Sequence, residues 1–361
     1  YLGWALFRRS PVHLPYIGAN YNAVYPFRTS VLFTDSLPLA ALFFKLLGGI
    51  LPTRFQYFGW WGLLCYALQG GLAQAVIARI AGVQPTFGRD DKSKAAIAII
   101  MSPGQAAKLW GSVLGAGVLV LFPALTIRMF AHTALAANWL VLLALYLWLR
   151  SDELMPTTRS ACLIWGGMGL LCAGIHLYYL PMVGLVLVGY AVRRALQKRG
   201  FAAVLAPIAA FCVAALAELV LLGAFAVNFA GYSNGYLSGA DYFGLFVPWL
   251  AQSWEQNVYA GIGTSLAVVL AVFGIVCNAR KAEKFFAAHR DWLIAGAVVL
   301  VLDLIAAGGN AITVNGKTLF TVPIPQFLMN FWAMFSSCAR LAWLAGMLLA
   351  AVGCGLVLRF W

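Results

Sequence analysis

The chain of 361 residues is too apolar for a soluble protein. Its residues are 63% hydrophobic and only 10% charged, whereas soluble domains are about 25% charged. The net charge of +13 would suit nucleic acid, but the basic residues lie in short loops between apolar runs, so we expect no nucleic-acid partner. The composition predicts an integral membrane protein that contacts membrane lipids.

Continuous apolar runs predict helices that cross the membrane. Because the runs do not alternate with polar residues, they favour α-helices over a β-barrel. We therefore predict an all-α polytopic membrane protein that forms a single domain over residues 1–361. About nine spans are expected, at 57–79, 111–129, 133–150, 161–175, 177–193, 202–226, 263–279, 293–309 and 338–359.

The first 56 residues form a long loop that carries a shorter apolar run. This run, "LPLAALFFKLLGGIL" at 37–51, is short for a span and has Lys45 near its middle. Such a length predicts a juxtamembrane helix that lies on the membrane or dips into it. No span precedes this loop, so we expect a first span ahead of Tyr1.

Basic loops predict the orientation of the spans. Most lysines and arginines fall in four loops, and nine spans place all four on one side, which the positive-inside rule makes cytoplasmic. The opposite loops, 1–56, 227–262 and 310–337, then face the outer, periplasmic side of a bacterial inner membrane. One alternative stays open: 161–193, interrupted by "HLYYLP", is either two passes or one broken helix. The basic loops are 80–110, 150–160, 193–200 and 280–291.

Polar residues that packing does not easily explain gather on the predicted outer side. Asp35 is either the N-cap of the 37–51 helix or a catalytic carboxylate. His132 lies between two spans and either bonds the backbone or meets a ligand, while His176 and Tyr178 form either an interfacial aromatic belt or a binding site. The remaining candidates, which are either solvated charges, headgroup contacts or site residues, are Asp241, Glu255, Tyr259, Lys317 and Arg340.

Two acids fall inside predicted spans. Glu218 and Asp303 are costly there and indicate either a proton or ion pathway or bonds to neighbouring helices. A transporter or lipid flippase would use such acids, but it would also be expected to show an internal repeat, which is not visible. The histidines are too dispersed to predict a metal site, and no nucleotide-binding or hydrolase motif appears.

Several segments together resemble a bacterial family of multi-pass membrane proteins of unknown function, which is itself similar to the GT-C glycosyltransferases. The most specific is "TDSLPL" at 34–39. The others are "YFGWWGLLCYALQGG", "FPALTIRMFAHTALAANW", "IHLYYLP", "WEQNVYAGIG" and "SSCARLAWL". The resemblance covers nearly the whole chain.

The resemblance implies a GT-C-like enzyme that takes a sugar from a polyprenyl-phosphate donor on the outer side of the membrane. Asp35 would act as the general base toward a hydroxyl of a glycan or lipid-linked acceptor. Arg340 and Lys317 would bind the donor phosphate, and His132, His176, Tyr178, Asp241, Glu255 and Tyr259 would bind substrate. A divalent metal stays open because GT-C members differ in this respect. A non-catalytic membrane assembly subunit is a further alternative.

Overall fold

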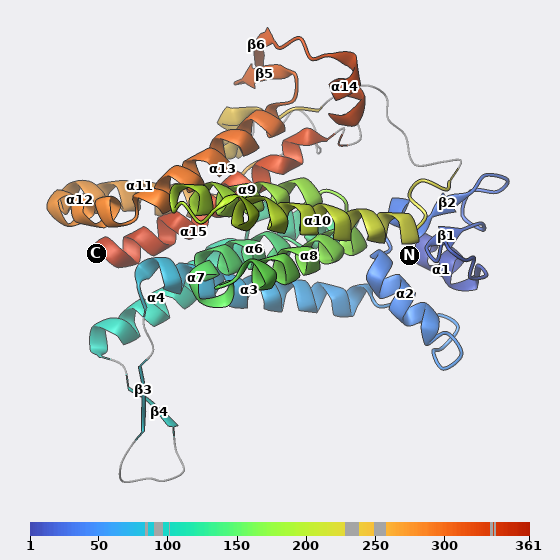
Figure 1. Ribbon diagram of the computed structural model, residues 1–361, viewed down its shortest axis with the longest axis horizontal. Helices are drawn as coiled ribbons and strands as arrows, with labels where there is room; N and C mark the ends of the chain where they lie inside the picture. Colours follow the sequence, from blue (N-terminus) through green and yellow to red (C-terminus); the bar gives the residue numbers. More distant parts are fainter. Residues whose placement is uncertain are drawn as a thin grey trace.

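The computed structural model describes residues 1–83, 86–89, 97–100, 102–227, 238–248, 258–332, 335 and 337–361. Long helices run side by side along one axis (Figure 1). The segments that contain Asp35 lie at one end of this bundle, which we call the Asp35 end. Helix α12 and the C terminus lie at the opposite end, which we call the Asp152 end.

The helices follow the apolar runs of the sequence. In chain order they are α1 (Leu2–Arg9), α2 (Pro38–Leu46), α3 (Phe58–Ala81), α4 (Pro103–Val120), α5 (Pro123–Ala131), α6 (Trp139–Leu149), α7 (Ser151–Leu154), α8 (Thr158–Ile175), α9 (Tyr179–Leu196), α10 (Phe201–Leu221), α11 (Ile262–Cys277), α12 (Ala279–Ala288), α13 (Arg290–Gly308), α14 (Gln326–Trp332) and α15 (Ala342–Phe360). Short 3₁₀ turns are η1 (Val31–Phe33), η2 (Thr133–Ala136), η3 (Tyr242–Leu245) and η7 (Cys338–Leu341).

Between 6 and 8 spans are long and apolar enough to cross a membrane within the described part of the chain. Six are single segments: α3, α8, α9, α10, α13 and η7 with α15. Two more are bent pairs, α4 with α5 at 47° and α11 with α12 at 105°. A shorter apolar segment, Thr133–Leu149, joins η2 to α6. The predicted polytopic helical architecture is thereby confirmed.

The structure confirms the two predicted helices of 161–193 and revises two other predicted spans. The run 161–193 is two helices, α8 and α9, separated at His176–Tyr178. The run 111–129 starts earlier, at Pro103, and bends before Pro123, which begins α5 at a position where its missing N–H does no harm. The run 263–279 reaches α12, which turns sharply away from α11.

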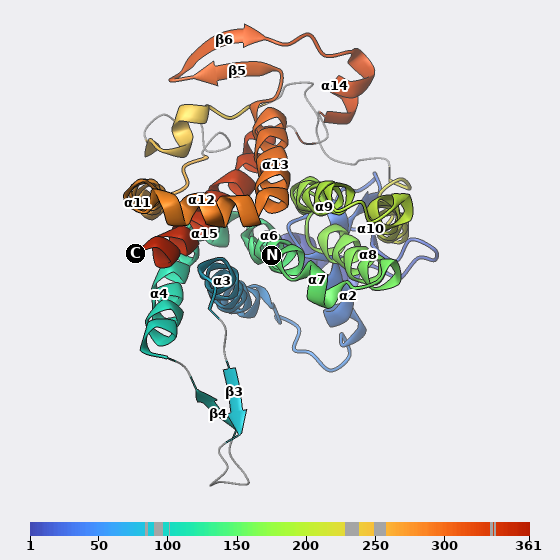
Figure 2. The ribbon, with the colours of Figure 1, turned by 60° about the vertical axis from the view of Figure 1, so that its left-hand side comes forward.

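Three antiparallel hairpins accompany the helices, and the all-α prediction did not anticipate them. They pair β1 (Ala19–Asn20) with β2 (Thr29–Ser30), β3 (Thr86–Arg89) with β4 (Ile97–Ile100), and β5 (Ala311–Val314) with β6 (Lys317–Thr321). The second and third hairpins project from the bundle on opposite sides (Figure 2). The fold is therefore a helical bundle with small β appendages.

Small residues allow the helices to approach closely. A Cβ on Gly169 of α8 would lie 2.4 Å from the carbonyl oxygen of Phe211 in α10, and one on Gly353 of α15 would lie 3.2 Å from Ala267 of α11. Membrane helices associate through such backbone proximity because lipid supplies no hydrophobic driving force between them. These contacts bring the loops at the helix ends into fixed positions.

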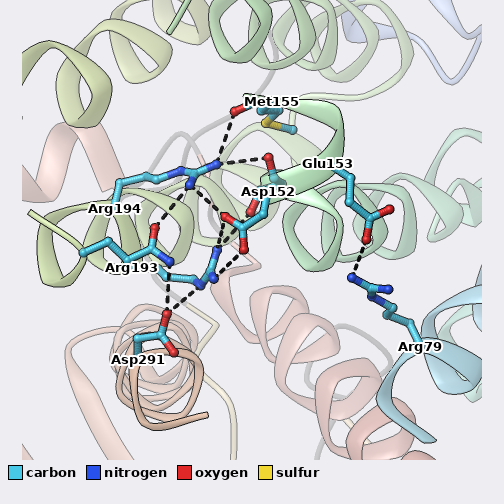
Figure 3. Close-up of polar contacts among 9 residues, drawn as sticks. Arg79, Asp152, Glu153, Met155, Arg193, Arg194 and Asp291 are labelled. Atoms are coloured by element: carbon cyan, nitrogen blue, oxygen red, sulfur yellow. Dashed lines mark hydrogen bonds and ion pairs between the residues drawn. The ribbon is translucent and has the colours of Figure 1, made fainter. Parts of the chain in front are cut away.

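Buried arginines hold the helices together at the Asp152 end (Figure 3). Arg193, which is 5% exposed, bonds Asp152 of α7 at 2.7 Å and Asp291 of α13 at 2.9 Å. Arg194 bonds Asp152 at 2.9 Å and the carbonyl oxygens of Ser151 and Met155. From the sequence, these arginines belong only to the basic loop 193–200, whereas in the structure each links α9 to neighbouring segments.

Candidate functional site

Asp35 is not a helix cap. The N-cap of α2 is Leu37, in a left-handed conformation with φ of 53°, and no side chain caps this end. Ser36 bonds the hydroxyl of Thr34. The carboxylate of Asp35 instead lies with its Oδ2 atom 3.2 Å from Nδ1 of His132, and it also accepts the backbone N–H of Ala134. The N-cap alternative for Asp35 is therefore wrong.

His132 is held at the point where two short helices meet. The backbone N–H of His132 donates to the carbonyl of Arg128 near the end of α5. The backbone carbonyl of His132 accepts the N–H of Leu135 in η2. The next residue, Thr133, accepts the indole N–H of Trp61 from α3 at 3.1 Å. Because backbone and neighbouring side chains fix this corner, the imidazole is directed toward Asp35.

The Asp35–His132 pair is partly open to its surroundings. The side chain of Asp35 is 33% exposed and that of His132 is 45% exposed. Burial raises the pKa of the Asp35 carboxyl above its usual value, while the charge of His132 and its hydrogen bond oppose this rise. A carboxylate with a raised pKa binds protons more readily than a solvated aspartate.

A second group of side chains lies at the break between α8 and α9. The N–H of Tyr178 donates to Nδ1 of His176 at 3.3 Å, and the hydroxyl of Tyr178 accepts the N–H of Ser337 at 3.0 Å. The guanidinium carbon of Arg340, in η7, lies 4.7 Å from the centre of the Tyr178 ring. Arg340 is only 9% exposed, so the aromatic face replaces part of its hydration.

Electrostatic interactions join the two groups. Burial lowers the pKa of His176 to about 3, and the charges of Arg340 and His132 act in the same direction. The charges of Arg340 and of His132 therefore both act on His176. Four segments far apart in the sequence thus supply one polar cluster at the Asp35 end.

Other predicted residues lie outside this cluster. The carboxylate of Asp241 accepts the N–H groups of Phe243, Asn315 and Gly316, so it anchors the turn between β5 and β6. Lys317 is exposed at the start of β6. Tyr259 lies on the segment that leads into α11 and is partly buried. Glu255 falls outside the described residues.

The two acids within helices have different surroundings. Asp303 of α13 is fully buried, and its Oδ2 atom accepts the N–H of Ala345 in α15 at 2.9 Å. Glu218 of α10 is partly exposed on the side of the helix. Asp303 therefore bonds a neighbouring helix, as one of the two alternatives from the sequence expected.

Arg128 is a residue that the sequence analysis missed. It lies in α5, one turn before His132, is 2% exposed, and has its guanidinium carbon 5.5 Å from the ring centre of Trp343 in α15. A charged residue within the apolar run "FPALTIRMFAH" is the signal that could have identified it. Arg128 and Arg340 together place two buried cations in or near this cluster.

The cluster combines three chemical capacities. A carboxylate with a raised pKa can accept a proton, an imidazole beside it can share that proton, and a buried guanidinium can stabilise an anion. No group of three or more metal-ligating side chains occurs among the residues that the structure describes. These side chains support acid–base chemistry beside a cation that can bind an anion.

The helical bundle and its apolar spans define a polytopic α-helical membrane protein. Within that class, the chain belongs to the family described as "Domain of unknown function (DUF6311)", whose family model matches residues 1–361. A search of curated proteins found no match. A search of solved structures also found none.

Proposed function

We propose that this protein is a GT-C-type membrane glycosyltransferase. It would move a sugar from a polyprenyl-phosphate donor to an acceptor hydroxyl on a glycan or lipid-linked molecule. The observation that carries the proposal is the cluster at the Asp35 end: the Asp35 carboxylate lies 3.2 Å from the imidazole of His132, and the charges of His132 and of the buried Arg340 both act on His176. In sugar transfer from a phosphate, a base that accepts the hydroxyl proton and a cation that stabilises the departing phosphate both lower the barrier.

Asp35 is the general base in this proposal. It takes the proton of the acceptor hydroxyl as that oxygen attacks the anomeric carbon and the bond from the sugar to phosphate breaks. His132 holds the carboxylate in one orientation through its bond to Oδ2. A raised pKa favours the role because a base works best when its pKa approaches the working pH.

Arg340 is the group that stabilises the departing phosphate. Its planar guanidinium can contact two phosphate oxygens at once, and the ring of Tyr178 supports its position. Burial strengthens such an interaction because little water screens it. Lys317 remains a predicted contact for the donor phosphate, and Tyr259, Glu255 and Asp241 remain predicted substrate contacts on the outer loops.

The proposed arrangement has nine spans with the Asp35 end outside. Six single spans, two bent pairs and the shorter segment Thr133–Leu149 add up to nine. The four basic loops follow the first, third, fifth and seventh of these spans, so they all lie on the same side of the membrane. The positive-inside rule makes that side cytoplasmic. The Asp35 cluster would then face the periplasm of a bacterial inner membrane.

The test measures sugar transfer in proteoliposomes. Purified protein is supplied with radiolabelled polyprenyl-phosphate hexoses and a membrane glycan extract, and labelled product and released polyprenyl phosphate are measured. Asp35→Asn keeps the shape of the side chain but removes its basicity. We expect transfer to fall by about 10²–10⁴-fold, the usual contribution of a general base.

Glu283→Gln is the matched control, because it neutralises an exposed acid on α12 at the opposite end. It should leave transfer unchanged. Full activity of Asp35→Asn would exclude Asp35 as the base. Movement of the labelled lipid between leaflets without any product would instead support a flippase.

A further inference from the structure

Three cations from three different helices meet at the Asp152 end, around the last turn of α3. Lys108 of α4 donates to the carbonyl of Ala81 at 3.4 Å, and Arg359 of α15 donates to the carbonyl of Ile80 at 3.1 Å. Lys281 of α12 donates to the carbonyl of Arg359 at 2.9 Å. We call Lys108, Lys281 and Arg359 the basic triad.

Among the residues that the structure describes, no carboxylate forms an ion pair with the basic triad. The charges of Arg359 and Lys281 both repel that of Lys108. The carbonyls that the triad contacts belong to helix C-termini, each equivalent to only about half a negative charge. A nearby anion would therefore be stabilised.

Donor capacity remains for such an anion. Lysine has three N–H donors and arginine has five, while the bonds above use one on each residue. The Arg359 guanidinium is seated between the ring of Phe285, 4.3 Å away, and the chain at Gly82, where a Cβ would lie 2.7 Å from its Nη1 atom. These contacts hold the guanidinium in place without neutralising it.

The position of the triad points to a membrane surface rather than to open solvent. Helix α12 turns by 105° from α11, so it runs across the end of the bundle, as a surface-lying helix does. Large apolar side chains are exposed on α4, on α11 and just after α15, with Trp110 at 70%, Phe273 at 55% and Trp361 at 68%. Aromatic residues gather at the level of lipid headgroups, and such exposed apolar surface suits acyl chains.

We propose that the basic triad binds the phosphate of an anionic phospholipid in the leaflet at the Asp152 end. The two lysines and the arginine contact the phosphate oxygens, and the acyl chains lie along the exposed faces of α4 and α11. This site lies at the opposite end of the bundle from the Asp35 cluster and does not depend on the proposed transferase activity. By joining α3, α4, α12 and α15, a bound lipid stabilises this end.

The test measures lipid binding to the purified protein in detergent by native mass spectrometry. Phosphatidylglycerol is titrated against phosphatidylcholine, which has no net charge. The variant Lys108→Gln with Lys281→Gln retains Arg359 and its bond to α3. We expect its affinity for phosphatidylglycerol to fall by about 10- to 30-fold, since each lysine near an anionic surface contributes about fivefold.

The matched control is Lys198→Gln with Arg199→Gln, which removes the same charge from exposed positions at the same end. It should bind phosphatidylglycerol like the original chain. Thermal unfolding without added lipid checks that both variants are folded. Equal loss of affinity in both variants, or equal retention, would overturn the site. Binding of inorganic phosphate as tight as that of phosphatidylglycerol would overturn a lipid as its occupant.

Discussion

At the residue scale, Asp35 and His132 show how a polar side chain in an apolar protein acquires a partner. Asp35 precedes α2 at a position where a cap was one expectation, but the N-cap of that helix is Leu37 instead. Ninety-seven residues along the chain, His132 lies within hydrogen-bond distance of it. A partly buried carboxylate needs a compensating donor, and the imidazole together with the N–H of Ala134 supplies it.

His176 predicts that the folded protein becomes less stable in acid. Its pKa in the folded protein is about 3, against about 6.5 in an unfolded chain. Since the unfolded state binds the proton more readily, stability is fully present above pH 6.5 and is lost as the pH falls toward 3. We expect the loss to reach about 1–2 kcal/mol at pH 5.

The measurement is thermal unfolding in detergent at pH 8 and pH 5 for the original chain and for His176→Gln. The variant should lose less stability between the two pH values. His289→Gln, at the Asp152 end, is the control and should behave like the original chain. A variant with the same acid-induced loss as the original would show that His176 does not cause it.

At the scale of elements, interruptions of the helices create the cluster. His132 separates α5 from η2, the segment 176–178 separates α8 from α9, and η7 precedes α15. At each interruption, backbone N–H and C=O groups lose their partners within the helix, and the side chains leave the regular helical faces. In a membrane bundle, such breaks are tolerated where protein surrounds them, and here they carry His132, His176 and Arg340.

The turn of the β5–β6 hairpin depends on hydrogen bonds to Asp241. Asp241 accepts three backbone N–H groups, two of them in the turn. Hydrogen bonds to a charged acceptor contribute about 1.5–3 kcal/mol each at most. Asp241→Ala should therefore increase hydrogen exchange of the Asn315 and Gly316 amides by about 10-fold or more, with little change in the spanning helices.

Asp241→Asn serves as the comparison, because its amide oxygen still accepts hydrogen bonds. It should show an intermediate effect. Unchanged exchange in the alanine variant would mean that strand pairing alone holds the turn.

At the scale of the whole molecule, the two ends of the bundle differ in their ion pairs. The Asp152 end is held by arginines that reach three helical segments, α7, α9 and α13, through Asp152 and Asp291. The ring of Trp292 lies 3.8 Å from the guanidinium carbon of Arg193 and adds a cation–π contact. The Asp35 end carries instead the Asp35–His132 pair, whose side chains are 33% and 45% exposed.

Arg193→Met tests this network. Removing one member of a buried ion pair leaves the other charge uncompensated, which costs about 3–5 kcal/mol. Because Asp152 is half-exposed, we expect a loss of unfolding free energy near the lower limit, about 3 kcal/mol. Unfolding in detergent with increasing denaturant measures it.

Arg159→Met is the matched control, since Arg159 is exposed at the same end. It should change the unfolding free energy by less than about 0.5 kcal/mol. Equal losses in the two variants would show that the Arg193 pairs do not contribute specifically.

The sequence predicted the class of protein and the approximate helix positions because hydropathy is a property of successive residues. It did not predict the bend before Pro123, the turn of α12 or the hairpins. These features depend on how the helix ends pack against distant segments. The two helices of 161–193 show this limit, since only the structure chose between one broken helix and two.

The sequence by itself determined that this chain lies in a membrane and that its polar residues collect in loops, because transfer into lipid penalises charge wherever it occurs along the chain. Only the tertiary structure decided which of those residues meet. Contact between Asp35 and His132, or between Tyr178 and Arg340, depends on helix rotation and on where each helix breaks. Residues of the same type, such as Asp241 and Asp35, therefore acquired different surroundings: one anchors a turn, and the other pairs with a histidine.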